Sequence, residues 1–331
     1  MHGAYELWRA AVDSGVKPII GIEAYVTPET ARQDKTRVSW DTNWTPVPGH
    51  ARNPDDVSGG GLITHLTMWR RTTKAGQPHQ ASSVANLEGR VMRYPRMDKE
   101  VLSTYSKGVI ASSGCPSGII QTRLRLGQFD EALRAAGEFQ DIFGKDNFYI
   151  ELMDHGLSIE SKVTGDLLTI AKKLGAPLLA TNDSHYVMEA DKDAQDAMLC
   201  INSGATLDDP NRFKFEGSGY YIKSAEEMRE LFKDHPDACD NTLEIAERCN
   251  VIFDDHEDGA FMPQFDCPEG WDETSLFLKK VEEGLEKRYD ATRRWRCSSR
   301  PTTNAASSAR CSSAATSSSS PTTSTGRRST A

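Results

Sequence analysis

The sequence predicts an α/β protein of parallel βα units, for three reasons. Apolar strand-like runs alternate along the chain with helical runs. Two of those helical runs, 129–144 and 159–175, precede the strand-like runs 146–155 and 176–185, and each ends at a glycine. The strand-like runs are apolar without interruption, as expected where helices cover a sheet.

The individual elements follow in order from this alternation. The first is a helix within residues 2–15, which ends at Gly15. Predicted strands occupy 16–27, 62–69, 107–115, 146–155 and 176–185. The polar stretch 28–61, rich in Pro and Gly, is predicted to be a long loop. After Asp191 the pattern becomes helical, with helices expected at 225–235, 238–250 and 272–289.

Three domains are predicted from these changes of pattern. Residues 1–215 form the barrel-like α/β part, residues 216–290 a mostly helical segment, and residues 291–331 a disordered tail rich in Ser, Thr and Arg. The tail contains no Val, Ile, Leu, Met, Phe or Tyr, so it cannot bury enough apolar surface to offset its chain entropy. Residues 70–83 follow a strand where a covering helix is due, but they include Gly76 and Pro78 and are almost free of apolar residues.

Charge and composition narrow the function. The formal net charge is −9, and the tail carries seven Arg and no acidic residue, so residues 1–290 carry −9 − 7 = −16. The strong negative charge of residues 1–290 argues against a broad surface that binds the phosphate backbone of a nucleic acid. It is compatible with a metal site lined by carboxylates. The seven Cys show no regular spacing and no CxxC pair, which indicates free thiols and a protein of the reducing cytoplasm. The sequence shows no segment suited to spanning a membrane or to secretion.

Ligand-type side chains lie at or near the ends of the predicted strands. In parallel βα folds such ends meet at one mouth, so we expect these side chains to converge. They are Glu23, His65, Cys115, Asp183 and His185, with the neighbours Asp154 and His155 as second-tier candidates. Carboxylate, imidazole and thiolate are ligands that zinc prefers, and the first two also accept manganese or iron. The pattern predicts a divalent metal site, and a carboxylate bridging two ions would suit phosphoester chemistry.

Each residue taken alone also has a structural explanation. Glu23 is as easily an ion-pair partner as a ligand, and a lone His65 is more often a satisfied core histidine. Cys115 is more often a small buried hydrophobe. Asp183 could cap the helix that follows it, and Asp154 and His155 could be polar loop residues.

The segments that carry these residues resemble the N-terminal PHP domain of the bacterial DNA polymerase III alpha subunit, in the form that actinobacteria use for replication. They are KPIIGIEAYV, THLTMW, GCPSG, QTRLRLGQFDEAL, FYIELMDHG, LLATNDSHYV and DPNRFKFEGSGYYIKSAEEM. The resemblance covers residues 1–290 except 70–83. Because neither residues 70–83 nor the tail at 291–331 resembles the family, our hypothesis is that both stretches are translated in a wrong reading frame.

This resemblance implies a distorted, TIM-like βα barrel with metal ions, zinc or manganese, at its mouth. Glu23, His65 and Cys115 match three of the family's ligands, and Asp183 and His185 match the pair in its last metal motif. The family begins with two strands that carry His-x-His and Asp-His-Gly-Asn-Met, which this sequence lacks. The expected fold is therefore a truncated barrel without its first two strands, followed by the helical segment and the tail.

The resemblance also implies a function in DNA replication, with metal-dependent 3′–5′ exonuclease potential in this domain. In the full-length family, magnesium supports DNA-directed DNA synthesis, but the palm aspartates are absent here and the chain is expected to be inactive as a polymerase. The implied partners are primed DNA template, dNTPs, the sliding clamp, a proofreading subunit and other holoenzyme subunits. Two alternatives stay open: a non-catalytic scaffold domain of the polymerase, and a stand-alone metal-dependent phosphoesterase.

Overall fold

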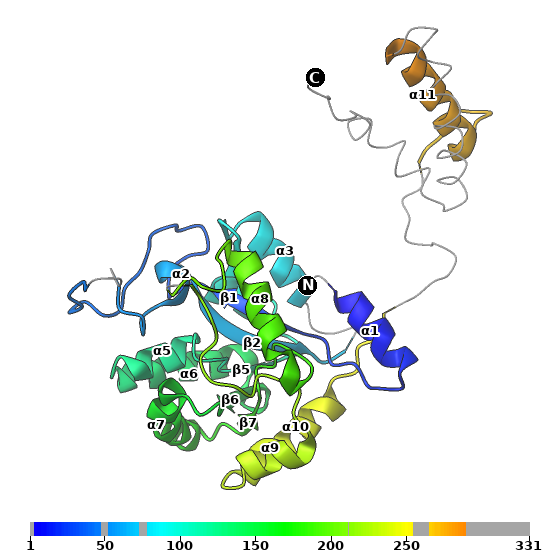
Figure 1. The fold of residues 1–331 in the computed structure, drawn as a ribbon. Coiled ribbons are helices and arrows are strands. Elements are labelled where there is room, and N and C mark those ends of the chain that lie inside the picture. Colours follow the sequence, from blue (N-terminus) through cyan, green and yellow to red (C-terminus); the bar gives the residue numbers. More distant parts are fainter. Residues whose placement is uncertain (1–2, 48–51, 73–77, 211, 254–264, 289–331) are drawn as a thin grey trace. The chain divides into compact units, whose positions relative to one another are not determined.

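A computed structural model describes residues 3–47, 52–72, 78–210, 212–253 and 265–288 of the chain (Figure 1). Residues 1–253 form one compact unit and residues 254–331 a second, in which α11 (Glu273–Arg288) is described. The tail at 291–331 lies outside the described residues. The predicted division at residue 215 stays a prediction, and residues 216–253 belong to the first unit.

The first unit is built on a seven-stranded sheet with the order β3-β4-β1-β2-β5-β6-β7. The strands are β1 (Gly21–Val26), β2 (Thr64–Arg70), β3 (Arg90–Val91), β4 (Tyr94–Met97), β5 (Val109–Ser112), β6 (Phe148–Leu152) and β7 (Leu178–Ala180). The predicted α/β class is confirmed, and the five predicted strands lie at β1, β2, β5, β6 and β7. The β3–β4 hairpin was not predicted, because two- and four-residue strands, one with a proline, give little sequence signal.

The expectation that all strands are parallel is wrong. β1 with β4, β5 with β6 and β6 with β7 are parallel, but β2 runs antiparallel to both β1 and β5, and β3 runs antiparallel to β4. The cause is the connection between β1 and β2. In its described parts, 27–47 and 52–63, the long loop contains the four-residue turn α2 (Ser58–Gly61) and no crossover helix, so the chain re-enters the sheet from the end at which it left.

The helices of the first unit are α1 (Ala4–Asp13), α3 (Pro78–Leu87), α4 (Lys99–Thr104), α5 (Ile119–Arg125), α6 (Phe129–Phe143), α7 (Ser158–Leu174), α8 (Lys192–Ser203), α9 (Ala225–Leu231) and α10 (Pro236–Arg248), with the short 3₁₀ turns η1 (Lys145–Asn147) and η2 (Glu189–Asp191). Of these, α3, α4, α6, α7 and α10 pack against strands of the sheet. Figure 1 shows α5, α6 and α7 grouped on one side of the sheet, and these helices contact one another. α10 packs against β7 at the sheet's edge.

The expectation that residues 70–83 contain no covering helix is wrong for the end of this stretch. β2 extends through Arg70, residues 73–77 are outside the described part, and α3 begins at Pro78. Ala81 and Ala85, four residues apart, are buried and give α3 a narrow apolar stripe that packs near β4. A proline at the first helical position costs nothing, since its missing N–H would have no partner there. Small residues therefore make a helix that a search for large apolar side chains overlooks.

The alternation of side chains divides the sheet into two faces. Ala24, Leu66 and Phe148 belong to the main core, with the apolar sides of α6 and α7, including Phe139 and Leu167. The opposite face, called here the inner face, has a second cluster. Ile110, Tyr149 and Leu179 pack there against Ile245 and Cys249, from α10 and its end. Glu23, His65 and Thr67 alternate with core residues and lie on this inner face.

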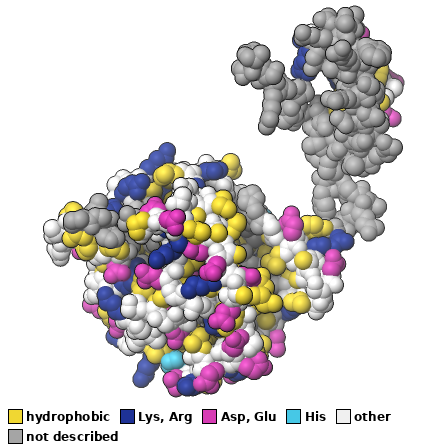
Figure 2. Space-filling view, viewed as in Figure 1, with side chains coloured by type: hydrophobic (Ala, Val, Ile, Leu, Met, Phe, Trp, Pro, Cys, Tyr) yellow, Lys and Arg dark blue, Asp and Glu magenta, His cyan; other side chains and the backbone are white. Residues whose placement is uncertain are grey.

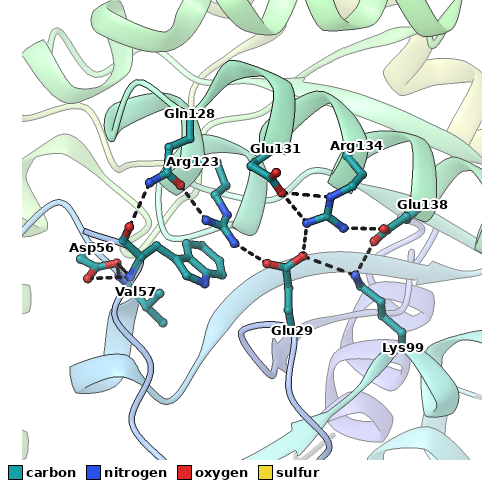
Figure 3. Close-up of polar contacts among 10 residues, drawn as sticks. Glu29, Asp56, Val57, Lys99, Arg123, Gln128, Glu131, Arg134 and Glu138 are labelled. Atoms are coloured by element: carbon teal, nitrogen blue, oxygen red, sulfur yellow. Dashed lines mark hydrogen bonds and ion pairs between the residues drawn. The ribbon is translucent and has the colours of Figure 1, made fainter. Parts of the chain in front are cut away.

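An ion-pair network ties the loop after β1 to α5 and α6 (Figure 3). Glu29 is its hub and accepts hydrogen bonds from Arg123 and Arg134, with Lys99 3.7 Å away. Arg134 also pairs with Glu131, and Glu138 forms ion pairs with both Arg134 and Lys99. Glu29 takes φ 62°, an uncommon left-handed conformation for a non-glycine residue. The network therefore holds a strained turn in place.

The surface carries both signs of charge. On the face shown in Figure 2, acidic and basic side chains are interspersed over the first unit. No helix of the described residues combines the length and the apolar character needed to cross a bilayer.

Candidate metal centre

Three of the predicted ligands meet in space. Nδ1 of His65 lies 2.8 Å from Oε1 of Glu23 and 3.2 Å from Sγ of Cys115, and the thiol lies 3.5 Å from the same carboxylate oxygen. Among the described residues, this trio is the group of His, Cys, Asp and Glu side chains whose donor atoms lie within 4.8 Å of one another. Residues 23, 65 and 115 come from β1, β2 and the turn after β5.

The antiparallel register explains why they meet. Tyr25 of β1 pairs with His65 of β2, so His65 stands at the start of its strand and beside the end of β1. Glu23 lies two residues before Tyr25 and on the same face, within reach of the imidazole. The predicted convergence is correct for these residues, but its stated reason is not: His65 lies at the mouth because β2 is inverted.

The turn that carries Cys115 is tightly shaped. Gly114 has φ 80°, and a Cβ there would lie 3.0 Å from the His65 carbonyl oxygen, so glycine is needed for the close approach of the turn to β2. The backbone N–H of His65 donates to the carbonyl of Ser117 at 3.1 Å, and the side-chain amide of Gln121 donates to the Gly114 carbonyl at 2.6 Å. The turn is thus held against the strand that supplies the histidine.

The electrostatics of the three side chains differ. The hydrogen bond from His65 lowers the pKa of Glu23 below its ordinary value, against the effect of burial. Burial raises the pKa of the Cys115 thiol well above its usual value, and the charges of Glu23 and Asp183 raise it further. In the absence of a cation, Glu23 is therefore an ionised acceptor and Cys115 a protonated thiol.

Asp183 and His185 lie close to this trio but outside its 4.8 Å limit. His185 Nε2 is 3.5 Å from Asp183 Oδ2, and this contact raises the pKa of His185. Burial opposes ionisation of Asp183, but the hydrogen bond from His185 and nearby positive charge keep its pKa below the usual value. The charge of Asp183 acts on Glu23 and Cys115, so the pair belongs to the same neighbourhood. Asp183 takes φ 41°, a left-handed conformation that often marks a functional turn.

The second-tier candidates are placed differently from the trio. The Asp154 carboxylate is exposed and accepts a hydrogen bond from the Gly156 N–H at 2.9 Å. The side chain of His155 is buried, with Nδ1 2.6 Å from Glu160 and Nε2 2.9 Å from the Asn182 carbonyl. Both ring nitrogens face oxygen acceptors and are already engaged, so His155 supports the backbone beside Asp183 rather than offering a free ligand atom.

Sequence reasoning missed two buried carboxylates next to the centre. Glu151 on β6 is 3% exposed, and burial raises its pKa. Glu160 on α7 is 5% exposed and holds His155. The one available signal was a Glu inside the apolar run FYIEL, at a position where the strand should be fully covered.

The trio fits a divalent ion. A tetrahedral ion about 2.0–2.3 Å from each ligand holds neighbouring donors roughly 3.3–3.8 Å apart. The Cys115–Glu23 separation of 3.5 Å falls in this range, whereas the Cys115–His65 and Glu23–His65 pairs, at 3.2 and 2.8 Å, have to open slightly. Carboxylate, imidazole and thiol are the donor set of a zinc-type site with an open position.

Residues 1–155 match the family model of the PHP domain, and the α/β fold agrees with the TIM-like, barrel-type fold of such domains.

The sequence of the chain is also similar, over a longer stretch than residues 1–155, to proteins named DNA polymerase III subunit alpha. The protein of Mycobacterium leprae is 47% identical over 292 residues, covering 87% of this chain and 24% of that protein. The one from Saccharopolyspora erythraea is 48% identical over 291 residues, again 87% and 24%. That of Borreliella burgdorferi is 36% identical over 295 residues, 87% of this chain and 23% of that protein. The chain thus spans about a quarter of the length of these alpha subunits.

Proposed function

We propose that this chain serves DNA replication as the PHP part of a DNA polymerase III alpha subunit, and that its metal centre removes 3′ nucleotides from DNA. The similarity to the alpha subunits supports the first part. The observation that carries the second is the cluster of Glu23, His65 and Cys115, whose donor atoms lie within 4.8 Å of one another.

Glu23, His65 and Cys115 would hold a zinc or manganese ion, and the nearby Asp183 and His185 would add further ligands. The ion, when bound, would act as a Lewis acid on a phosphodiester oxygen. The chain itself contributes geometry. The turn at Gly114 presents Cys115 to His65, and the contact between His185 and Asp183 orients the second pair.

Synthesis of DNA belongs to the whole alpha subunit in this proposal, with magnesium, dNTPs and a primed template. The sliding clamp, a proofreading subunit and other holoenzyme subunits are its proposed partners, and the cytoplasm its compartment. We propose that incorporation of nucleotides needs the length of the whole alpha subunit, of which the present chain spans about a quarter.

Metal content and nuclease activity test the proposal. The purified chain is dialysed against Zn²⁺ or Mn²⁺, its metal is measured by mass spectrometry, and it is incubated with primed DNA that has a mismatched 3′ end. We expect a stoichiometric ion and loss of the 3′ nucleotide, both abolished in Cys115→Ala. A metal-free wild type, or equal metal in the variant, would refute the centre.

A scaffold role without catalysis is the second candidate. The contact between Asp183 and His185 favours it, since these side chains already satisfy each other without an ion. This role requires that the chain fold normally, bind no stoichiometric metal and release no nucleotide from DNA or phosphate from small phosphomonoesters. The same measurements therefore separate the two functions.

A further inference from the structure

Glu151 is a buried carboxylate that the ligand set does not use. It lies on β6, in the middle of the sheet, and is 3% exposed. Burying a carboxylate is costly unless its oxygens are well hydrogen-bonded, and an apolar residue would fill this strand position without that cost. None of the contacts described for its oxygens comes from a cationic side chain. The placement of this charge therefore needs a reason other than core packing.

The two oxygens of Glu151 reach segments on both sides of its strand. Oε2 accepts hydrogen bonds from the Ser112 hydroxyl and from the Gly114 N–H at 3.1 Å. Oε1 accepts one from the Thr181 hydroxyl at 2.6 Å. Gly114 directly precedes Cys115, and Thr181 lies two residues before Asp183. One side chain thus joins the turn that carries the thiol to the segment that carries the Asp183–His185 pair.

A carboxylate suits this task better than an amide. The Gly114 N–H can only donate, and the two hydroxyls use their protons toward Glu151, so the junction needs acceptors on both oxygens. A glutamine at this position would have a single acceptor oxygen. Its NH₂ group would then face a donor, either Thr181 on one side or Ser112 and Gly114 on the other. The side-chain amide of Gln121 donates to the Gly114 carbonyl, and Glu151 accepts from the Gly114 N–H. The two hydrogen bonds together fix the orientation of the Gly114 backbone, and Glu151 supplies one of them.

We propose that Glu151 is a positioning residue of the metal centre, which holds the Cys115 turn and the Thr181–Asp183 segment at a fixed separation. This inference rests on the proposed metal site, but it concerns a residue outside the ligand set. Its consequence is that loss of one acceptor oxygen loosens the site while every ligand remains present.

The test uses the full chain with Glu151→Gln and a matched control, Asp56→Asn. Asp56 is also 3% exposed and also accepts several hydrogen bonds, from Ser39 and the Trp40 and Val57 N–H groups, but it lies in the loop before β2 (Figure 3). Co²⁺ is the probe, because its thiolate charge-transfer band reports ligation by cysteine, and Cys115→Ala gives the reference without that ligand. We expect Glu151→Gln to weaken Co²⁺ binding about 10- to 100-fold with a reduced band. Asp56→Asn should keep both the affinity and the band.

A second readout works without metal. The rate at which iodoacetamide alkylates Cys115, followed by peptide mass spectrometry in EDTA, reports how firmly the turn is held. We expect several-fold faster alkylation in Glu151→Gln than in wild type or Asp56→Asn. If wild type binds no Co²⁺, the proposed metal function fails, and alkylation alone then decides the role of Glu151. Equal alkylation in the two variants, or equal Co²⁺ affinity where wild type binds the ion, would overturn the inference.

Discussion

Replacing the hub of the ion-pair network, Glu29→Gln, should destabilise the first unit measurably. The substitution keeps the size of the side chain but removes the charge that Arg123 and Arg134 share. Arg134 retains Glu131 and Glu138, whereas the contacts described for Arg123 leave it the Gln128 amide and the Trp40 ring, 3.7 Å from its guanidinium. The cost therefore falls mainly on Arg123.

The burial of the two partners sets the magnitude. The side chains of Arg123 and Glu29 are 11% and 19% exposed. Breaking a fully buried pair costs about 3–5 kcal/mol and losing an exposed one about 0–1 kcal/mol. This nearly buried pair should lie between, at about 2 kcal/mol, which corresponds to a fall of roughly 4–8 °C in melting temperature for a unit of this size.

The same network predicts the sign of a pH dependence. Burial disfavours the charge on Glu29, but the hydrogen bonds from Arg134 and Arg123 outweigh it and lower the folded-state pKa. Its contribution is therefore fully present above the unfolded-state pKa of about 4.3 and is lost as the pH falls through the lower folded-state value. The difference between wild type and Glu29→Gln should be constant near neutral pH and shrink below about pH 4.

Urea unfolding followed by circular dichroism measures both effects. Glu131→Gln is the matched control, since Glu131 pairs with Arg134 at the surface and is 49% exposed. We expect it to cost at most about 1 kcal/mol. A Glu29→Gln variant no less stable than this control, or a stability difference that grows toward low pH, would refute the reasoning.

Three further outcomes are expected. Cys115→Ala removes a proposed ligand atom and should lower Zn²⁺ affinity, measured by calorimetry, by more than the about 10- to 100-fold that loss of a supporting partner costs; unchanged affinity would exclude the thiol from the site. Phe148→Ala, at a fully buried position, should cost about 3–5 kcal/mol in urea unfolding, whereas Leu87→Ala, 85% exposed, should stay within about 0.5 kcal/mol. Asp98 accepts a hydrogen bond from the Val101 N–H at the start of α4, so Asp98→Ala should cost about 1 kcal/mol more than Asp98→Asn, which keeps a cap, and equal losses would argue against capping.

Local patterns were sufficient for the elements that are long or strongly apolar. β1, β5 and β6, and the helices α6 and α7, lie where the apolar runs and terminal glycines predict them. The β3–β4 hairpin and α3 were not predicted from the sequence, because their burial depends on small residues and on neighbours from distant segments. Their assignment needs tertiary contacts that no short window contains.

By itself, the sequence determined which side chains were chemically suited to a metal and, through residues 1–155, the match to the PHP family model. Only the tertiary structure decided how they meet. The inverted β2 brings His65 to Glu23, the left-handed Gly114 turns Cys115 toward both, and buried Glu151 spans two strands to hold that turn. Strand direction and cross-strand hydrogen bonds depend on how the chain closes its loops in space, and residue type at one position carries no record of that.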